Sequence, residues 1–153
     1  MKKGTLLVCF GALAVALLVL AGCGGSDDSD SLTKDEFVAQ GNAICKKGTE
    51  ERNRIFKEEQ ARAENKPNQT FSDADREQLV RDVIVPPYEK TTKELKELGT
   101  PDEGAADVEA IVEAREKAIQ KVDANPAPAV ESTVQFVEAN KLSAAYGLTD
   151  CVV

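Results

Sequence analysis

The chain has 153 residues, of which 42% are hydrophobic, 30% charged and 5% aromatic, and it contains four cysteines and no histidine. This length fits one domain, and the composition differs from that of collagen-like, low-complexity and multi-span membrane proteins. Without histidine, the chain has no Ser-His-Asp triad, no Cys-His pair and no metal site built on imidazole. The net charge of −8 and the pI of about 4.7 argue against a nucleic-acid-binding surface, because such surfaces need clustered lysine and arginine.

The first 22 residues have the pattern of an export signal. Two lysines precede an apolar run over residues 6–20, and small residues follow the run. The run is short for a membrane span, which needs about 20 predominantly apolar residues. Its end, Leu20-Ala21-Gly22-Cys23, resembles the lipobox of bacterial lipoproteins. The alternative is an uncleaved anchor helix in which Cys23 has no special role.

The lipobox resemblance implies a lipid anchor on Cys23. In lipoproteins a diacylglycerol is transferred to the cysteine sulfur, and the chain is then cut between Gly22 and Cys23. Two or more acyl chains, such as palmitate, hold a protein firmly at the membrane, whereas one chain binds only marginally. Removal of residues 1–22 also removes two lysines and no acid, which leaves a net charge of −10. Anionic headgroups therefore repel the domain, so we expect membrane contact through the N-terminal lipid and no basic membrane-binding face.

Residues 24–32, Gly-Gly-Ser-Asp-Asp-Ser-Asp-Ser-Leu, contain almost nothing that a core can bury. This composition predicts a flexible, self-repelling spacer with a reach of about 15–18 Å. We therefore expect three parts: a lipoprotein signal peptide over residues 1–22, the lipidated cysteine and its linker over residues 23–32, and a helical domain over residues 33–153.

Two cysteines, Cys45 and Cys151, remain for the mature domain, since Cys9 leaves with the signal and Cys23 carries the lipid. An exported protein meets an oxidising compartment, where such a pair normally forms a disulfide. A disulfide that closes a loop of about 100 residues stabilises a fold by roughly 4.7 kcal/mol in the chain-entropy model. The alternative is two separate buried thiols. The spacing predicts neither a Cys-x-x-Cys redox centre nor a metal site.

Hydrophobic periodicity and capping signals predict four helices. The first begins at the capping box of Thr33 and Glu36 and ends near the loop at residues 65–68. Its apolar stripe contains Gly41 and Gly48, each of which costs nearly 1 kcal/mol relative to alanine, and a closely packed neighbouring helix is one reason to keep them. The second helix begins after Ser72, is kinked or broken by the Pro86-Pro87 pair, and ends near residue 99.

Capping and ending signals in the second half of the chain predict two further helices. Thr100-Pro101-Asp102-Glu103 combines a cap, a proline at the first helical position and an acid at the third, and the helix should run to residue 124. The fourth helix should run from Pro128 to Tyr146 and end in a Schellman motif at Gly147-Leu148. Short connections predict an all-α up-down-up-down bundle, in which the tail must fold back along the bundle to bring Cys151 to Cys45.

Two short motifs bracket this domain: Asn42-Ala43-Ile44-Cys45 in the first helix, and Tyr146-Gly147-Leu148-Thr149-Asp150-Cys151 at the end. With these motifs the mature domain resembles small, uncharacterised actinobacterial helical lipoproteins. The resemblance implies a helical domain bracketed by the two cysteines, and it implies no activity.

Carboxylates on the third helix are the clearest candidates for chemistry. Glu109, Glu113 and Glu116 share one face, a spacing that suits acid–base work or a hard cation. Arg115 and two lysines lie in the same region, and a solvated polar face is the interpretation we favour. We expect the aromatic residues to pack in the core and at helix ends rather than around a ligand.

Three functional hypotheses follow. The first is a non-catalytic envelope lipoprotein whose helical domain offers a surface to another envelope protein. The second is a small-ligand or lipid carrier that uses an apolar interhelical cavity of a few hundred Å³ near Pro86-Pro87. The third is a hydrolase that uses carboxylates alone, but this needs two inward-facing acids, and those identified above face outward. We therefore expect no enzymatic activity, no cofactor, no metal and no nucleic-acid partner.

Overall fold

The computed structural model describes residues 32–64 and 72–153, and in these ranges it is all-helical, with no strand. This agrees with the all-α class expected from the sequence. The elements are α1 (Lys34–Glu64), α2 (Asp73–Leu79), the π-helical η1 (Val80–Ile84), α3 (Val85–Glu97), α4 (Ala105–Ala124), α5 (Ala127–Glu131), the 3₁₀ turn η2 (Val134–Phe136), α6 (Val137–Tyr146) and the 3₁₀ turn η3 (Thr149–Cys151). The expected signal peptide, the lipidated Cys23 and the linker up to residue 31 lie outside the described residues.

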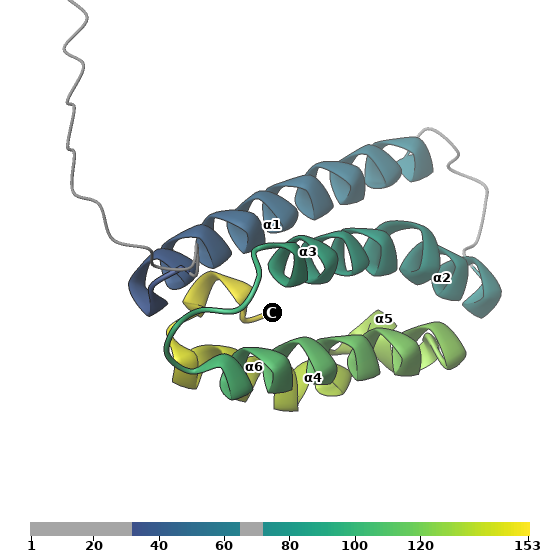
Figure 1. The fold of residues 1–153 in the computed structure, drawn as a ribbon. Coiled ribbons are helices and arrows are strands. Elements are labelled where there is room, and N and C mark those ends of the chain that lie inside the picture. The colour runs from purple at the N-terminus through teal and green to yellow at the C-terminus, as the bar shows by residue number, and fades with distance from the viewer. Residues whose placement is uncertain (1–31, 65–71) are drawn as a thin grey trace, which may run out of the picture.

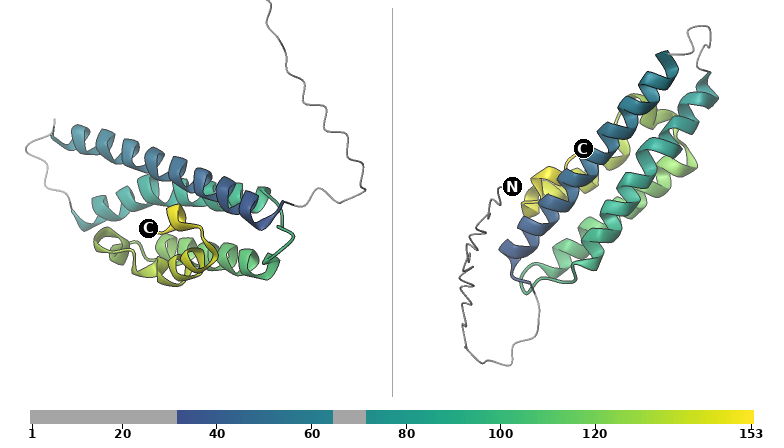
Figure 2. Two further views of the ribbon diagram at one scale, coloured as in Figure 1. Left: turned by 90° about the vertical axis from the view of Figure 1, so that its left-hand side faces the viewer. Right: turned by 90° about the horizontal axis from the view of Figure 1, so that it is seen from above.

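The helices stack side by side, with α3 between α1 and α4 (Figure 1). The short helices α5 and α6 return along α4, and η3 packs against α1 and α6. The last residue lies in the middle of the bundle, between α1 and the layer of α4 to α6, rather than at an end of the molecule (Figure 2). None of the helices in the two described ranges is both long enough and apolar enough to cross a membrane.

Two of the expected helix starts are confirmed by their hydrogen bonds. The backbone N–H of Thr33 donates to Glu36 Oε2 at 3.0 Å, and the N–H of Glu36 donates back to Thr33 Oγ1 at 3.3 Å. Ser72 and Asp75 form the same reciprocal box at the start of α2. Each box satisfies two of the amide donors that a helix start leaves without an intrahelical partner.

The Pro86-Pro87 pair widens the preceding turn instead of ending the helix. A proline has no N–H, and its ring clashes with the carbonyl four residues earlier. The chain accommodates this by the π-helical turn η1, at whose end the N–H of Val85 donates to the carbonyl of Val80, five residues back. The two prolines then follow Val85 in the first turn of α3.

The expected third helix start at Thr100-Pro101-Asp102-Glu103 is wrong. Helix α4 begins at Ala105, after Gly104 with φ of +79°. Tertiary contacts hold the preceding segment: Pro101 is buried, the N–H of Asp102 donates to the carbonyl of Leu32 at 2.9 Å, and Tyr146 Oη donates to the carbonyl of Glu103 at 3.0 Å. These contacts outweigh the local capping signal.

The expected continuous fourth helix is also wrong, because the chain breaks it between α5 and η2. Ser132 is extended, with φ of −156° and ψ of 161°. The break lets Thr133 Oγ1 donate to the carbonyl of Val153 at 3.3 Å, and it brings the ring of Phe136 to 4.6 Å from that of Tyr88. Hydrophobic packing of Phe136, which is 3% exposed, stabilises this geometry over a straight helix.

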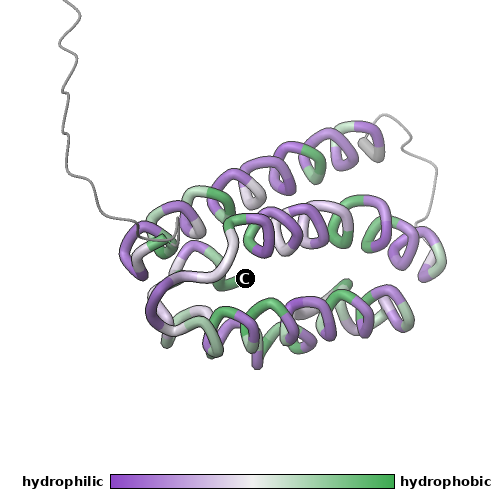
Figure 3. The backbone as a smooth tube through the Cα atoms, in the orientation of Figure 1, coloured by the Kyte–Doolittle hydropathy of each residue, from purple (hydrophilic) through white to green (hydrophobic). Residues whose placement is uncertain are grey.

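Apolar residues alternate with polar ones along each helix, as expected for helices that bury one face (Figure 3). The buried residues form two clusters. The first contains Phe37, Cys45, Leu95, Val108, Ile111, Tyr146, Leu148 and Cys151, and the second contains Val80, Val85, Tyr88, Ala118, Ile119, Val122 and Phe136. We expected a closely packed neighbouring helix to explain the glycines in the apolar stripe of α1. Gly48 agrees with this, since a Cβ there would clash with the Thr91 methyl group on α3.

Candidate functional site

The tail after α6 folds back into the bundle through a Schellman motif. Gly147 has φ of +104°, and the N–H of Leu148 donates to the carbonyl of Ser143 at 2.9 Å. Leu148 is 1% exposed and fills the space beside Gly41, where a Cβ would lie 2.6 Å from its Cδ2. The helix ending expected at Gly147-Leu148 is therefore confirmed.

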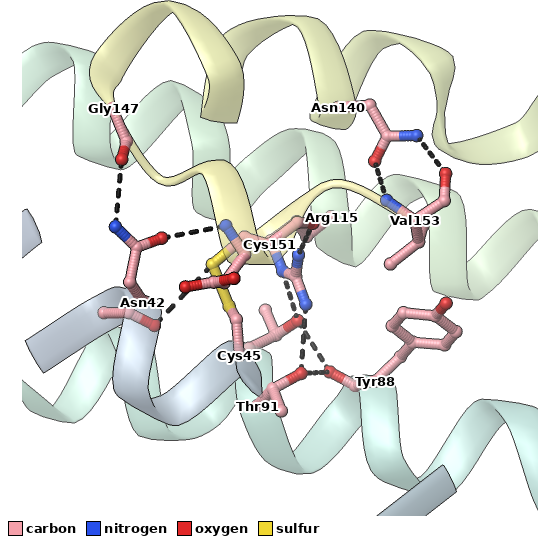
Figure 4. The surroundings of a disulfide bond; sticks show 12 residues. Asn42, Cys45, Tyr88, Thr91, Arg115, Asn140, Gly147, Cys151 and Val153 are labelled. Carbon is pink, nitrogen blue, oxygen red and sulfur yellow. Dashed lines mark hydrogen bonds between the residues drawn. A yellow bond between two sulfur atoms is a disulfide. The ribbon is translucent and has the colours of Figure 1, made fainter. Parts of the chain in front are cut away.

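A disulfide joins this tail to α1, as the cysteine count predicts. Cys45 Sγ and Cys151 Sγ lie 1.94 Å apart, and both residues are buried. One turn earlier on α1, Asn42 Nδ2 donates to the carbonyl of Gly147 at 3.0 Å, and Asn42 Oδ1 accepts from the N–H of Asp150 at 2.9 Å (Figure 4). The amide of Asn42 thus binds the tail at two points, just before η3 and within it.

A second asparagine holds the end of the tail. Asn140, on α6, donates from Nδ2 to the carbonyl of Val153 at 2.7 Å and accepts from the N–H of Val153 at 3.1 Å. The two asparagines lie on opposite sides of the disulfide in Figure 4. The tail is therefore fixed along its length, by one covalent bond and by paired amide hydrogen bonds.

Arg115 lies under this tail with only 2% of its surface exposed. Its Nε donates to Thr92 Oγ1 at 3.0 Å, its Nη2 to Thr91 Oγ1 at 3.0 Å, and its Nη1 to the carbonyl of Cys151 at 3.3 Å. Within the described part of the chain, no carboxylate forms an ion pair with it. Burial lowers the pKa of Arg115 to about 10, because the low-dielectric interior disfavours the charged form.

The expectation that Arg115 shares the solvated face of the third helix is wrong. On α4 it lies one turn from Ile111 and one turn from Ala118, so it belongs to the buried stripe and separates the two apolar clusters. The glutamates do occupy the outer face. Glu113 pairs with Lys117 at 2.6 Å, and Glu116 pairs with Lys96 of α3 at 3.2 Å. Of the three glutamates, Glu113 alone lines a groove in the described part of the chain, and there it is paired with Lys117.

Tyr88 contacts a second arginine, Arg52 of α1, and the charge of Arg115 also acts on it. Arg52 Nη1 donates to Tyr88 Oη, and the guanidinium carbon lies 5.4 Å from the centre of the ring. Burial raises the pKa of Tyr88, while the charges of Arg52 and Arg115 act in the opposite direction. The charges of two guanidinium groups therefore act on one buried phenol.

An apolar groove of about 250 Å³ opens beside this tyrosine. Residues from α1, η1, α3, α5, η2 and the last position line it: Arg52, Phe56, Val83, Ile84, Tyr88, Ala129, Ser132, Thr133, Phe136 and Val153. Phe56 is 51% exposed, which contradicts the expectation that all the aromatic residues are packed in the core or at helix ends. Ile84 and Tyr88, which flank the Pro86-Pro87 pair in the sequence, line the groove, whereas the two prolines do not.

A much smaller hollow lies between the groove and the disulfide. Its volume of about 10 Å³ is close to the space that one water molecule needs. Both arginines and Tyr88 line it, together with Asp150 and the two disulfide cysteines. Another groove of about 280 Å³ lies between α4 and α6, but its lining carries charges of both signs, including the Glu113–Lys117 ion pair.

Comparisons of the chain with family models, with curated proteins and with solved structures find no match. Sequence reasoning missed both arginines. The signal for Arg115 was its helical spacing from Ile111 and Ile119, whereas nothing in the sequence marks Arg52, because its role depends on the position of Tyr88 on another helix.

Proposed function

We propose that the mature protein is a lipoprotein of the outer face of the cell membrane, with a non-catalytic helical domain that binds a small apolar ligand in the groove beside Pro86-Pro87. In this proposal residues 1–22 are the signal peptide, whose helix is removed, Cys23 carries the lipid, and residues 23–32 are the tether. The domain is a four-helix bundle in up-down-up-down order, in which α2 to α3 and α5 to α6 each count as one interrupted helix.

The observation that carries the proposal is the groove. Its volume of about 250 Å³ lies just below the range for ligand pockets, about 300–1,000 Å³. Its walls are mainly aliphatic and aromatic, with the Ser132 and Thr133 hydroxyls at one side. A ligand that covers the half-exposed ring of Phe56 removes apolar surface from water, which favours binding by about 25 cal/mol per Å².

A groove-filling variant tests this site. We expect native mass spectrometry of the lipoprotein, released from its own membrane, to show a bound apolar small molecule. Ala129→Trp places an indole in the groove and should remove this adduct. Ala145→Trp, on the exposed side of α6, is the matched control and should keep it. A wild-type protein without an adduct, which also fails to bind the neutral dye Nile red, would refute the proposal.

The anchor has a separate test. Cys23→Ser removes the sulfur atom that accepts the lipid. The variant should therefore lack the mass of the acyl groups, lose membrane retention through the lipid, and keep its signal peptide uncut. Cys9→Ser, inside the signal, should leave the lipid mass and the mature N-terminus unchanged. A mature protein that still begins at Met1 in the wild type contradicts the anchor.

A second candidate function, contact with another envelope protein, is favoured by an exposed apolar pair. Val134 and Val137 are 59% and 60% exposed and lie three residues apart across the start of α6, so their side chains are neighbours. A photo-crosslinking residue at position 137 should capture a specific envelope protein if this pair is an interface. Val134→Glu should then abolish the capture, and Val130→Glu should not.

A further inference from the structure

We infer that the ligand of the groove is a single-chain carboxylate amphiphile, a medium-chain fatty acid, with its carboxylate bound by Arg52 beside Tyr88 and its alkyl chain along the apolar walls. This inference rests on the proposed function, since it names the chemistry of the ligand that the groove binds.

The charge of the groove is the first argument. Among the residues that line the groove, Arg52 is the one with a charged side chain, in a chain whose net charge is −8. Three other arginines of the described ranges, Arg54, Arg62 and Arg81, lie within ion-pair distance of glutamates. Arg52 instead contacts the phenol of Tyr88, and no carboxylate in residues 32–64 or 72–153 forms an ion pair with it. Its guanidinium therefore retains donors for an anion at the rim.

Arg115 strengthens the same end of the groove. It lines the same small hollow as Tyr88, is 2% exposed, and in the described ranges hydrogen-bonds only neutral oxygens: two threonine hydroxyls and the carbonyl of Cys151. A positive charge in a low-dielectric interior acts over a longer distance than one in water, and apolar walls focus its field toward the opening. Asp150, an exposed residue, is the carboxylate that lines the small hollow below, and it makes no ion pair with either arginine in the described structure.

The apolar walls and the volume define the rest of the ligand. Val83, Ile84, Ala129 and Phe136 form a surface without charge that suits an alkyl chain. A volume of about 250 Å³ is smaller than the pockets that enclose a drug-sized ligand. It therefore suits one short chain rather than the two chains of a diacyl phospholipid. Guanidinium binds a carboxylate through two parallel hydrogen bonds, which fits a fatty-acid headgroup.

Photo-crosslinking to the lipoprotein in phospholipid vesicles tests this inference. Three probes carry a diazirine on a ten-carbon chain: decanoic acid, decanol and a phosphatidic acid. We expect the decanoic-acid probe to label groove residues, to be displaced by decanoate, and to label at least about tenfold more than the decanol probe, because a charged hydrogen bond contributes that much. The phosphatidic-acid probe should leave the groove unlabelled.

Variants at two neighbouring arginines separate charge from folding. Arg52→Gln should reduce labelling by decanoic acid at least about tenfold and leave labelling by decanol unchanged, whereas Arg52→Lys should keep a large part of the acid labelling. Arg54→Gln, whose side chain pairs with Glu58 on the exposed face of α1, should behave as the wild type. Unchanged labelling of Arg52→Gln by the decanol probe would also show that the groove is still folded in this variant.

The possible outcomes distinguish this inference from the function on which it rests. Equal labelling by acid and alcohol, unaffected by Arg52→Gln, would overturn the carboxylate ligand and leave an apolar ligand site in place. Stronger labelling by the phosphatidic-acid probe would overturn the fatty acid in favour of a phospholipid. Absence of groove labelling by all three probes would overturn both proposals.

Discussion

Arg115, in the middle of α4, donates a hydrogen bond to the carbonyl oxygen of Cys151, in the tail, at 3.3 Å. Cys151 therefore has two roles: its sulfur bonds the tail to α1, and its backbone carbonyl accepts a hydrogen bond from the buried guanidinium of α4. Because Thr91 and Thr92 of α3 accept the other hydrogen bonds of the guanidinium, α3, α4 and the tail meet at one side chain. This polar layer separates the two apolar clusters of the core.

The volume of Arg115 should matter more to stability than its charge. A buried charge without an ionic partner carries a desolvation cost, and its replacement by an apolar side chain of similar length is often neutral or stabilising. We expect Arg115→Met to change the free energy of unfolding by less than about 1.5 kcal/mol, since relief of desolvation offsets the lost bond to Cys151. Arg115→Ala should lose about 2–5 kcal/mol through the cavity that it leaves.

Urea denaturation of both variants measures the difference. The matched exposed pair Lys121→Met and Lys121→Ala, one and a half turns further along α4, should differ by less than about 0.5 kcal/mol. If Arg115→Met is as unstable as Arg115→Ala, the hydrogen bonds of the guanidinium rather than its packing stabilise this layer.

The disulfide should provide a large share of the stability of the tail. The double variant Cys45→Ser and Cys151→Ser opens a loop with a sequence separation of 106, and we expect the free energy of unfolding to fall by about 2–5 kcal/mol. Denaturant unfolding checks this value. Wild-type protein treated with a reducing agent should show the same loss, and a reduced wild type with an unchanged midpoint would contradict it.

The tail is also held by an amide that hydrogen exchange can report. Asn42→Ala removes the donor to Gly147 and the acceptor of the Asp150 N–H. We expect a loss of about 1–3 kcal/mol and faster exchange of the Asp150 amide, because both backbone groups lose their partner. Asn53→Ala, at an exposed position about three turns further along α1, should leave this amide unchanged. Unchanged exchange in Asn42→Ala would mean that the disulfide alone orders the tail.

Local signals predicted those parts of the fold in which neighbouring residues determine the geometry. The boxes at Thr33–Glu36 and Ser72–Asp75 and the glycine ending at Gly147 each satisfy backbone groups within a few residues. The start expected at Thr100-Pro101 has an equally good local pattern, and it fails because its backbone bonds Leu32 and Tyr146 instead. Such distant partners are absent from any sequence window.

The candidate site depends on distant contacts even more strongly. The sequence predicted that Pro86-Pro87 disturbs its helix, and the groove lies beside that pair. Its opposite wall exists because the chain breaks at Ser132 and turns Phe136 toward Tyr88. Arg52 and Tyr88 meet from helices whose relative register no local pattern defines. The sequence therefore shows which residue types are available for the site, but it does not show which of them come together in the fold.

Acid should weaken the start of α1 through one carboxylate. Hydrogen bonds from the side chain and then the backbone of Thr33 lower the pKa of Glu36 below its ordinary value of 4.5. Because the folded-state pKa is the lower one, this contribution is present above about pH 4.5 and is lost as the pH falls through the folded-state value. Glu36→Gln should therefore show a smaller fall of Tm between pH 7 and pH 3 than the wild type. Glu50→Gln, exposed on the same helix, is the matched charge control; if both variants show the same fall, the cap has no special role.

Close packing between α1 and α3 should appear as coupling between Gly48 and Thr91. In Gly48→Ala the new Cβ clashes with the Thr91 methyl group, and overpacking of this kind costs about 1–3 kcal/mol. Thr91→Ser removes that methyl group and keeps the hydroxyl, which donates to the carbonyl of Tyr88 and accepts from Arg115. The double variant should therefore recover at least half of the loss, since alanine also has the higher helix propensity. A double-mutant cycle in urea gives the coupling energy, and a value near zero would show that the two helices separate to accept the methyl group.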